Sequence, residues 1–180
     1  MRRQFLLGGI LVLGVAGFLG AEEEGGAGRE QTQEEKARKN ITLGAMYCEE
    51  FKQQEGVRTL KNGIMYKVEA TGKGKTPKTS NWIKVNYVGK HVDGKVFEKS
   101  KEGEPVRFRV DRTVAGWEDV LPRMREGDKW EIVIPSHLAY GATGKYGRED
   151  GTIGANETLV FLIELVEVED PAKKSEIKQP

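Results

Sequence analysis

From residue 62 onward, apolar and polar residues alternate along five segments of the chain. The first segment has Ile64, Tyr66 and Val68 in phase, and the others cover residues 82–90, 105–110, 129–135 and 158–168. A repeat of two residues is typical of a strand with one buried face. Turn-forming residues, such as Asp93-Gly94 and Glu126-Gly127-Asp128, separate the segments. The pattern predicts a mostly antiparallel sheet with one face in the core.

One stretch between the third and fourth segments has a helical repeat instead. Four apolar residues follow Gly116 at spacings of three, one and three: Trp117, Val120, Leu121 and Met124. A helix here would bury them against the apolar face of the sheet. Pro122 lies late in the stretch, where a proline removes a backbone donor and clashes with the preceding turn. We therefore expect a short helix that is distorted or shortened near Pro122.

Residues 30–55 predict a second helix. Its apolar stripe consists of Ile41, Ala45 and Cys48, with Met46 and Phe51 less regularly placed. Gly44 weakens the helix from within, Gly56 ends it, and residues 57–60 read as a linker. Two interpretations fit the stripe: the helix packs on the main domain, or it pairs with a second copy of the chain as a weak homodimer through residues 30–55.

The first 21 residues have the organisation of an export signal. Arg2 and Arg3 precede an uncharged apolar run over residues 5–19, and the small residues Gly20 and Ala21 follow. The run is short for a membrane span, which needs about 20 residues. We expect a cleaved signal peptide, no stable membrane span after processing, and a periplasmic or secreted protein. The alternatives are an uncleaved N-terminal anchor and a eukaryotic secretory pathway.

The expected organisation has four parts: a signal peptide or anchor (1–21), a flexible segment and N-terminal helix (22–61), the β-rich domain (62–169) and a disordered tail (170–180). Residues 22–29 are rich in Glu and Gly, a composition that does not support a packed core.

Charge and reactive residues exclude several classes of function. The chain has 29 Lys and Arg against 28 Asp and Glu, and losing Arg2 and Arg3 would leave a formal charge near −1. Nucleic-acid binding is therefore not expected, because it favours a basic face. Cys48 is the single cysteine, and His91 and His137 are the only histidines. No hydrolase triad, nucleotide loop or metal-ligand motif can be assembled, so we expect neither a metal nor a cofactor.

Aromatic residues are distributed over the predicted strands and their connections: Tyr87, Phe97, Phe108, Trp117, Tyr140 and Phe161. Ordinary core packing is one interpretation. A cluster that stays partly open, with a few polar groups at its edge, would instead be a small-ligand or peptide site.

Five motifs occur in order: Val85-Asn86-Tyr87-Val88-Gly89, Asp93-Gly94-Lys95-Val96-Phe97-Glu98-Lys99-Ser100, Val114-Ala115-Gly116-Trp117, Ala139-Tyr140-Gly141-Ala142 and Thr158-Leu159-Val160-Phe161. The series resembles the FKBP-type prolyl isomerases over residues 62–169. Residues 52–68 and 153–159 resemble the bacterial macrophage-infectivity-potentiator (Mip) group of that family, whose members are exported.

The resemblance implies an α+β fold: a curved antiparallel sheet, or half-barrel, wrapped around one short helix, with an N-terminal helical extension. It implies that proline enters between sheet and helix, with Trp117 as the floor of the pocket. The catalytic residues would be Tyr87, Phe97, Glu98, Trp117, Tyr140 and Phe161, and the substrate-binding residues Val106, Phe108, Val114 and Ile153. The Tyr140 hydroxyl and the Val114 N–H would hold substrate carbonyls.

The implied activity is peptidyl-prolyl cis/trans isomerisation that assists the folding of exported proteins. The implied partners are proline-containing polypeptides and macrolide inhibitors of the rapamycin type. Glu98 stands where the family usually has Asp, and Val106 where it often has Phe. These departures motivate an alternative, a non-catalytic peptide-binding chaperone on the same fold. A third hypothesis is a structural or adhesive surface module that dimerises through the N-terminal helix.

Overall fold

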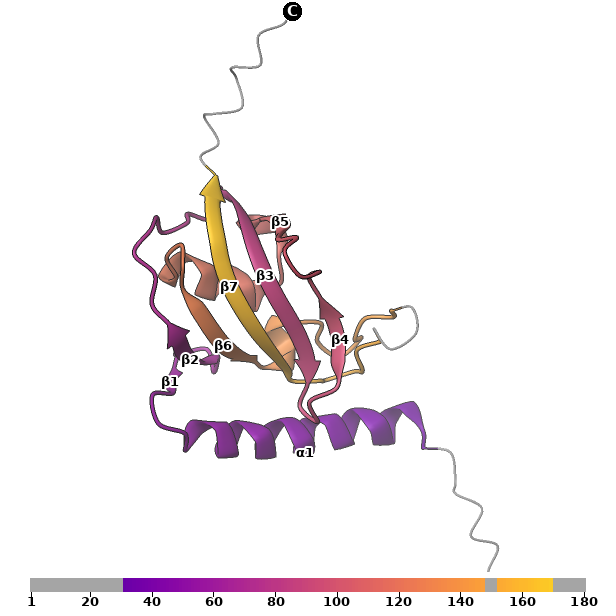
Figure 1. Cartoon of the computed structure of the whole chain (residues 1–180). Coiled ribbons are helices and arrows are strands. Elements are labelled where there is room, and N and C mark those ends of the chain that lie inside the picture. Colours follow the sequence, from indigo (N-terminus) through magenta and orange to yellow (C-terminus); the bar gives the residue numbers. More distant parts are fainter. Residues whose placement is uncertain (1–30, 148–151, 170–180) are drawn as a thin grey trace, which may run out of the picture. The chain divides into compact units, whose positions relative to one another are not determined.

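A computed structural model describes residues 31–147 and 152–169. These residues form one antiparallel sheet with the strand order β1-β2-β6-β7-β3-β4, and β5 also pairs with β3. The strands are β1 (Arg58–Thr59), β2 (Met65–Ala70), β3 (Trp82–His91), β4 (Val96–Lys99), β5 (Val106–Arg109), β6 (Lys129–Ile134) and β7 (Leu159–Glu169). The sheet is curved and does not close (Figure 1), so the predicted α+β fold is confirmed.

All five predicted strands are present, and the predicted turn at Asp93-Gly94 joins β3 to β4. The N–H of Gly94 donates to the carbonyl of His91 at 3.0 Å, and Gly94 has a φ of 88°, which glycine adopts without steric cost. Two strands were not predicted. β4 lies in the Phe97 motif, and β1 lies in the expected linker, where Arg58 pairs with Tyr66. The linker prediction for residues 57–60 is therefore wrong at Arg58–Thr59, because a two-residue strand shows no alternation of its own.

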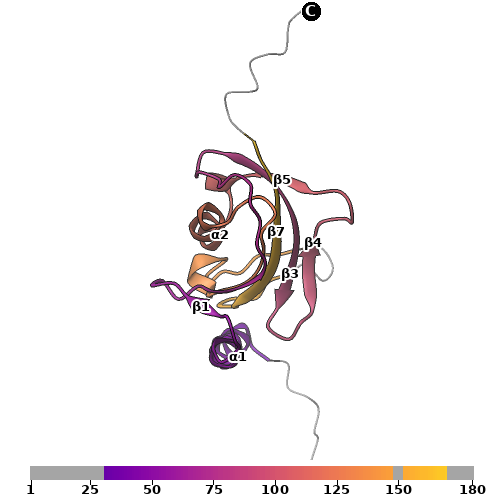
Figure 2. The ribbon, with the colours of Figure 1, turned by 60° about the vertical axis from the view of Figure 1, so that its left-hand side comes forward.

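The short helix α2 (Ala115–Val120) lies on the inner side of the curved sheet (Figure 2). Trp117, Val120, Leu121 and Met124 are all buried, as predicted. The α-helix ends at Val120 and continues as a 3₁₀ turn, η2 (Leu121–Arg123), which confirms the distortion expected from Pro122. A Cβ on Gly116 would lie 2.5 Å from Cγ2 of Ile134, so glycine allows α2 its close approach to the sheet.

The N-terminal helix α1 (Gln33–Lys52) begins with a capping box. The side chain of Thr32 accepts from the N–H of Glu35, and the Glu35 carboxylate accepts from the N–H of Thr32. The helix ends at Lys52, four residues before the expected stop at Gly56.

The predicted apolar stripe of α1 is only partly correct as a packing face: Cys48 and Phe51 pack against the domain, but Ile41, Ala45 and Met46 do not. Ile41 and Met46 are 55% and 65% exposed, and Ala45 is exposed as well. The face that meets the domain instead carries Asn40 and Gly44, and then Tyr47, Cys48 and Phe51. The Asn40 amide donates to the carbonyl of Ala155 at 3.0 Å. A Cβ on Gly44 would overlap Oγ1 of Thr158, so this glycine permits the contact that brings the helix against the domain.

A small second core lies under the end of α1. Phe51 packs with Met65 of β2, Val133 of β6 and Val160 of β7. Because side chains alternate along a strand, these three residues point away from the main core. The sheet therefore buries apolar residues on both faces near α1, where the sequence pattern predicted one buried face.

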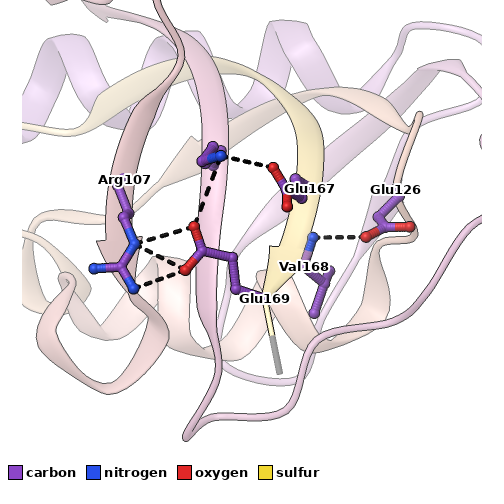
Figure 3. Close-up of polar contacts among 6 residues, drawn as sticks. Arg107, Glu126, Glu167, Val168 and Glu169 are labelled. Carbon is purple, nitrogen blue, oxygen red and sulfur yellow. Dashed lines mark hydrogen bonds and ion pairs between the residues drawn. The ribbon is translucent and has the colours of Figure 1, made fainter. Parts of the chain in front are cut away.

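Charged side chains connect three strands at the far end of β7 (Figure 3). The guanidinium of Arg107 in β5 binds the carboxylate of Glu169 in β7 through hydrogen bonds of 2.7 to 3.1 Å. Lys84 of β3 binds Glu167 at 2.7 Å. The carboxylate of Glu126 accepts from the N–H of Val168 at 2.6 Å. These contacts fix the register of the strands where β7 ends.

No helix in the described ranges is both long enough and apolar enough to cross a membrane. The expected signal peptide (1–21) and C-terminal tail (170–180) lie outside the described residues.

Candidate functional site

An aromatic pocket of about 350 Å³ lies where Trp117 of α2 faces β3, β5 and β7. Its lining consists of Tyr87, Glu98, Phe108, Arg112, Thr113, Val114, Trp117, Tyr140, Lys145 and Phe161. Seven of the ten residues expected to form a site are in this set. Binding pockets for small ligands have volumes of roughly 300–1,000 Å³, so the pocket has room for one small apolar group.

Trp117 is the centre of the aromatic cluster. Its ring meets those of Tyr87, Phe108 and Phe161 edge-to-face, at centroid distances of 5.5, 5.6 and 5.4 Å and interplanar angles of 81° to 84°. This is a favoured arrangement for aromatic pairs. The indole is 4% exposed, because α2 presses it onto the sheet. Trp117 is thus held firmly by its neighbours and forms the floor of the pocket.

Three expected site residues do not line the pocket. Phe97 packs edge-to-face on Phe161 at 5.7 Å and supports that wall from outside. A Cβ on Gly89 would lie 2.6 Å from the Phe97 ring, so only glycine leaves space for this ring. Val106 is half-buried against the main core. Ile153 is buried in the core, and its backbone pairs with that of Lys145.

Two hydrogen-bond donors remain unused at the pocket. Val114 directly precedes α2, and its carbonyl accepts from the N–H groups of Trp117 and Glu118. Within residues 31–147 and 152–169, the N–H of Val114 and the hydroxyl of Tyr140 donate to no protein group. A bound molecule with carbonyl oxygens can accept from both.

Tyr87 and Glu98 form a polar pair in the lining of the pocket. Burial is the main cause of the raised pKa of the Tyr87 hydroxyl, and the charge of Glu98 and a hydrogen bond to its carboxylate raise it further. The hydroxyl therefore stays protonated at neutral pH beside the Glu98 carboxylate. Lys145 lies 3.7 Å from the Glu98 carboxylate and 5.4 Å from the centre of the Tyr140 ring. Glu98 thus connects Tyr87 to Lys145.

Sequence reasoning missed Arg112, Thr113 and Lys145, all of which line the pocket. Arg112 and Thr113 directly precede Val114, so their place beside a recognised motif was the available signal. Lys145 follows the Tyr140 motif by five residues.

The protein has a larger hollow of about 610 Å³ beside the N-terminal half of α1. Its lining mixes polar residues such as Lys36, Asn40 and Glu157 with apolar ones such as Leu43, and Tyr146 is its one tyrosine. In the part of the chain that the structure describes, no three His, Cys, Asp or Glu side chains are grouped as metal ligands. The aromatic pocket is therefore the better candidate for an apolar ligand.

Comparison with known proteins agrees with this architecture. Residues 73–166 match the family described as FKBP-type peptidyl-prolyl cis-trans isomerase, and residues 21–68 match the domain described as amino terminal to it. The FKBP-type peptidyl-prolyl cis-trans isomerase FkpA of Escherichia coli (strain K12) is 42% identical over 146 residues, which cover 81% of this chain and 52% of the relative. The peptidyl-prolyl cis-trans isomerase Mip of Coxiella burnetii is 42% identical over 118 residues, which cover 65% and 50%.

The fold comparison gives the same result. The crystal structure of FkpA from Escherichia coli superposes with a TM-score of 0.71 at 41% identity, covering 76% of this chain and 62% of that one. The chain spans about half the length of the curated relatives it matches. The resemblance found in the sequence motifs is confirmed.

Proposed function

Because this chain belongs to the FKBP-type peptidyl-prolyl cis-trans isomerase family, we propose that it catalyses cis–trans isomerisation of Xaa–Pro bonds and so assists the folding of exported proteins. One observation carries the proposal. An aromatic pocket floored by Trp117 has two unused donors, the Val114 N–H and the Tyr140 hydroxyl.

The reaction needs no nucleophile. Amide resonance sets a barrier of about 18–20 kcal/mol, and uncatalysed isomerisation at proline takes tens to hundreds of seconds. Catalysis requires the twisted amide to be bound better than either planar form. The twisted amide is less polar at its carbonyl, so an apolar pocket favours it over water. An acceleration of about 10³ needs about 4 kcal/mol of such differential binding.

In this mechanism the proline ring lies on Trp117, between Tyr87, Phe108 and Phe161. The Tyr140 hydroxyl and the Val114 N–H donate to substrate carbonyls. Donors already in position act without reorganisation during the reaction. Tyr87 and Glu98 line the same pocket as Tyr140, and Phe97 packs on Phe161. The same apolar floor is the proposed site for macrolide inhibitors of the rapamycin type.

Export to the periplasm or the exterior is part of the proposal and rests on the signal-like residues 1–21. A weak homodimer through α1 is a further part, supported by the exposed side chains of Ile41 and Met46. Sedimentation of the full chain and of an Ile41→Glu, Met46→Glu variant tests it. Identical monomeric sedimentation of both proteins rules out the dimer.

The activity is tested by the cis-to-trans rate of short Leu–Pro peptides. We expect strong acceleration by the folded protein. Tyr140→Phe should lower kcat/KM about three- to tenfold, the cost of one hydrogen bond. Tyr146→Phe is the matched control, because Tyr146 is 89% exposed and does not line this pocket. A folded wild type without acceleration rejects the isomerase and favours the non-catalytic chaperone. Equal losses in both variants reject the role of Tyr140.

A further inference from the structure

Among the described residues, the lining of the aromatic pocket has one more positive than negative side chain. Arg112, Lys145 and Glu98 are the charged residues of its lining. Lys145 forms an ion pair with Glu98 at 3.7 Å. Arg112 is exposed and forms no ion pair with any residue in the described ranges. Its neighbour Asp111 is already bound to Arg109 at 2.9 Å. One guanidinium charge therefore remains available beside the pocket.

Arg112 also has a fixed place relative to the proposed substrate. It ends the 3₁₀ turn η1 (Val110–Arg112) and stands two residues before Val114, whose N–H is a proposed donor to the substrate. The Thr113 hydroxyl donates to the Val110 carbonyl at 2.7 Å, and the Thr113 N–H donates to the same carbonyl. These bonds hold the backbone between the turn and Val114. The Cα atom of Arg112 therefore has a fixed position at the mouth of the pocket.

Lys145 contributes to the charge of the pocket mouth in a different way, because it neutralises the Glu98 carboxylate. The Glu98 carboxylate lies at the same mouth and would repel an anionic substrate. Lys145 pairs with it, and its ammonium group lies over the Tyr140 ring. Because the charges of Lys145 and Glu98 cancel, Arg112 is the remaining charge that faces an incoming peptide. Exposed ion pairs of this kind change an equilibrium by about two- to fivefold, and salt screens them.

We propose that this pocket prefers substrates in which Asp or Glu directly precedes or follows the proline, and that Arg112 binds that carboxylate. Arg112 is then a specificity-determining residue for the isomerase reaction, and Lys145 supports it by neutralising Glu98. The inference rests on the proposed isomerase function and names the side-chain charge beside the proline that this pocket favours over a neutral side chain of the same shape.

The test compares isosteric peptides with blocked ends. Two pairs are used, Glu–Pro against Gln–Pro and Pro–Glu against Pro–Gln, with a Leu–Pro peptide as the reference for activity. The value of kcat/KM is measured for each at about 0.01 M ionic strength, where the screening length is about 30 Å. We expect the Glu peptide to exceed the Gln peptide about two- to fivefold in at least one pair. Raising the ionic strength to about 1 M should bring the ratio to about one.

Variants of Arg112 and Lys145 test which side chain causes the preference for Glu over Gln. Arg112→Gln should bring the Glu-to-Gln ratio to about one, and Lys145→Gln should lower it because Glu98 is then unopposed. Arg58→Gln, at an exposed arginine of β1 outside the pocket, should leave the ratio unchanged. A ratio of one or less in both pairs, or a ratio that Arg112→Gln leaves undiminished, overturns the inference. Failure to accelerate the Leu–Pro peptide instead overturns the proposed function itself.

Discussion

Two helices pack against this sheet in different ways. On the inner face, α2 presents Trp117, whose ring meets three others edge-on and leaves a pocket of about 350 Å³ beside them. On the other face, α1 approaches through Gly44 and covers Met65, Val133 and Val160 with the ring of Phe51, and Tyr47 packs beside it. The packing on the inner face leaves a pocket beside Trp117, whereas the Gly44 contact brings α1 close to Thr158. The inner face beside α2 is therefore suited to binding a ligand, whereas the outer face under α1 holds the helix on the domain.

The largest expected effect is on the α1 side. Phe51 is 1% exposed, so Phe51→Ala should lower the free energy of unfolding by about 3–5 kcal/mol. Activity per folded molecule should stay within about twofold, because Phe51 is remote from the pocket lining. Urea unfolding and the Leu–Pro assay measure the two quantities. Met46→Ala, at an exposed position of the same helix, should change stability by less than about 0.5 kcal/mol. If the folded Phe51→Ala protein loses activity, the packing under α1 and the function of the pocket are not independent.

A pair of tryptophans tests the inner face. Trp117 and Trp130 are both buried, and both have an indole N–H without a partner in the described structure. Trp130 stacks on Tyr66 and does not line the pocket. Changing either to Leu should cost about 2–3 kcal/mol of stability. Trp117→Leu alone should also lower kcat/KM by about 100-fold, because it removes the floor. Similar activity in the two folded variants would show that the floor is not specific to Trp117.

The smallest effect sharpens the role of glycine in α1. Alanine is favoured over glycine in a helix by about 1 kcal/mol. Gly44→Ala should nevertheless lower stability by about 1–3 kcal/mol, since the added Cβ overlaps Thr158. Thr42→Ala, at an exposed position of the same helix, is the control for urea unfolding. A Gly44→Ala protein that is more stable than the wild type would mean that α1 does not press on Thr158.

The predictable parts of the fold are those with a local pattern. The alternation of Ile83, Val85 and Tyr87, for example, was sufficient to find β3, and Pro122 was sufficient to place the end of α2. The packing face of α1 was not predictable. It depends on Asn40 meeting Ala155 and Gly44 meeting Thr158, partners more than a hundred residues away.

The same distinction applies to the pocket. Its aromatic residues follow from motifs, whereas Arg112 and Lys145 have no periodic signal. They line the same pocket as Glu98 only because two separate loops and a strand come together in the folded protein. Phe97 differs from both. Its motif was recognised, but its ring backs Phe161 and does not reach the pocket lining.

The position of β7 has a consequence for how the molecule is made. Among the described strands β7 is the last in the sequence, yet it lies between β6 and β3 in the sheet. A chain that has emerged from a ribosome or a translocation pore only as far as residue 158 holds two separate ribbons, β1-β2-β6 on one side and β3 with β4 and β5 on the other. The sheet cannot join until the final strand arrives. Long-range pairing of this kind folds slowly. The complete sheet therefore forms late, after β7 has been synthesised and has inserted between β6 and β3.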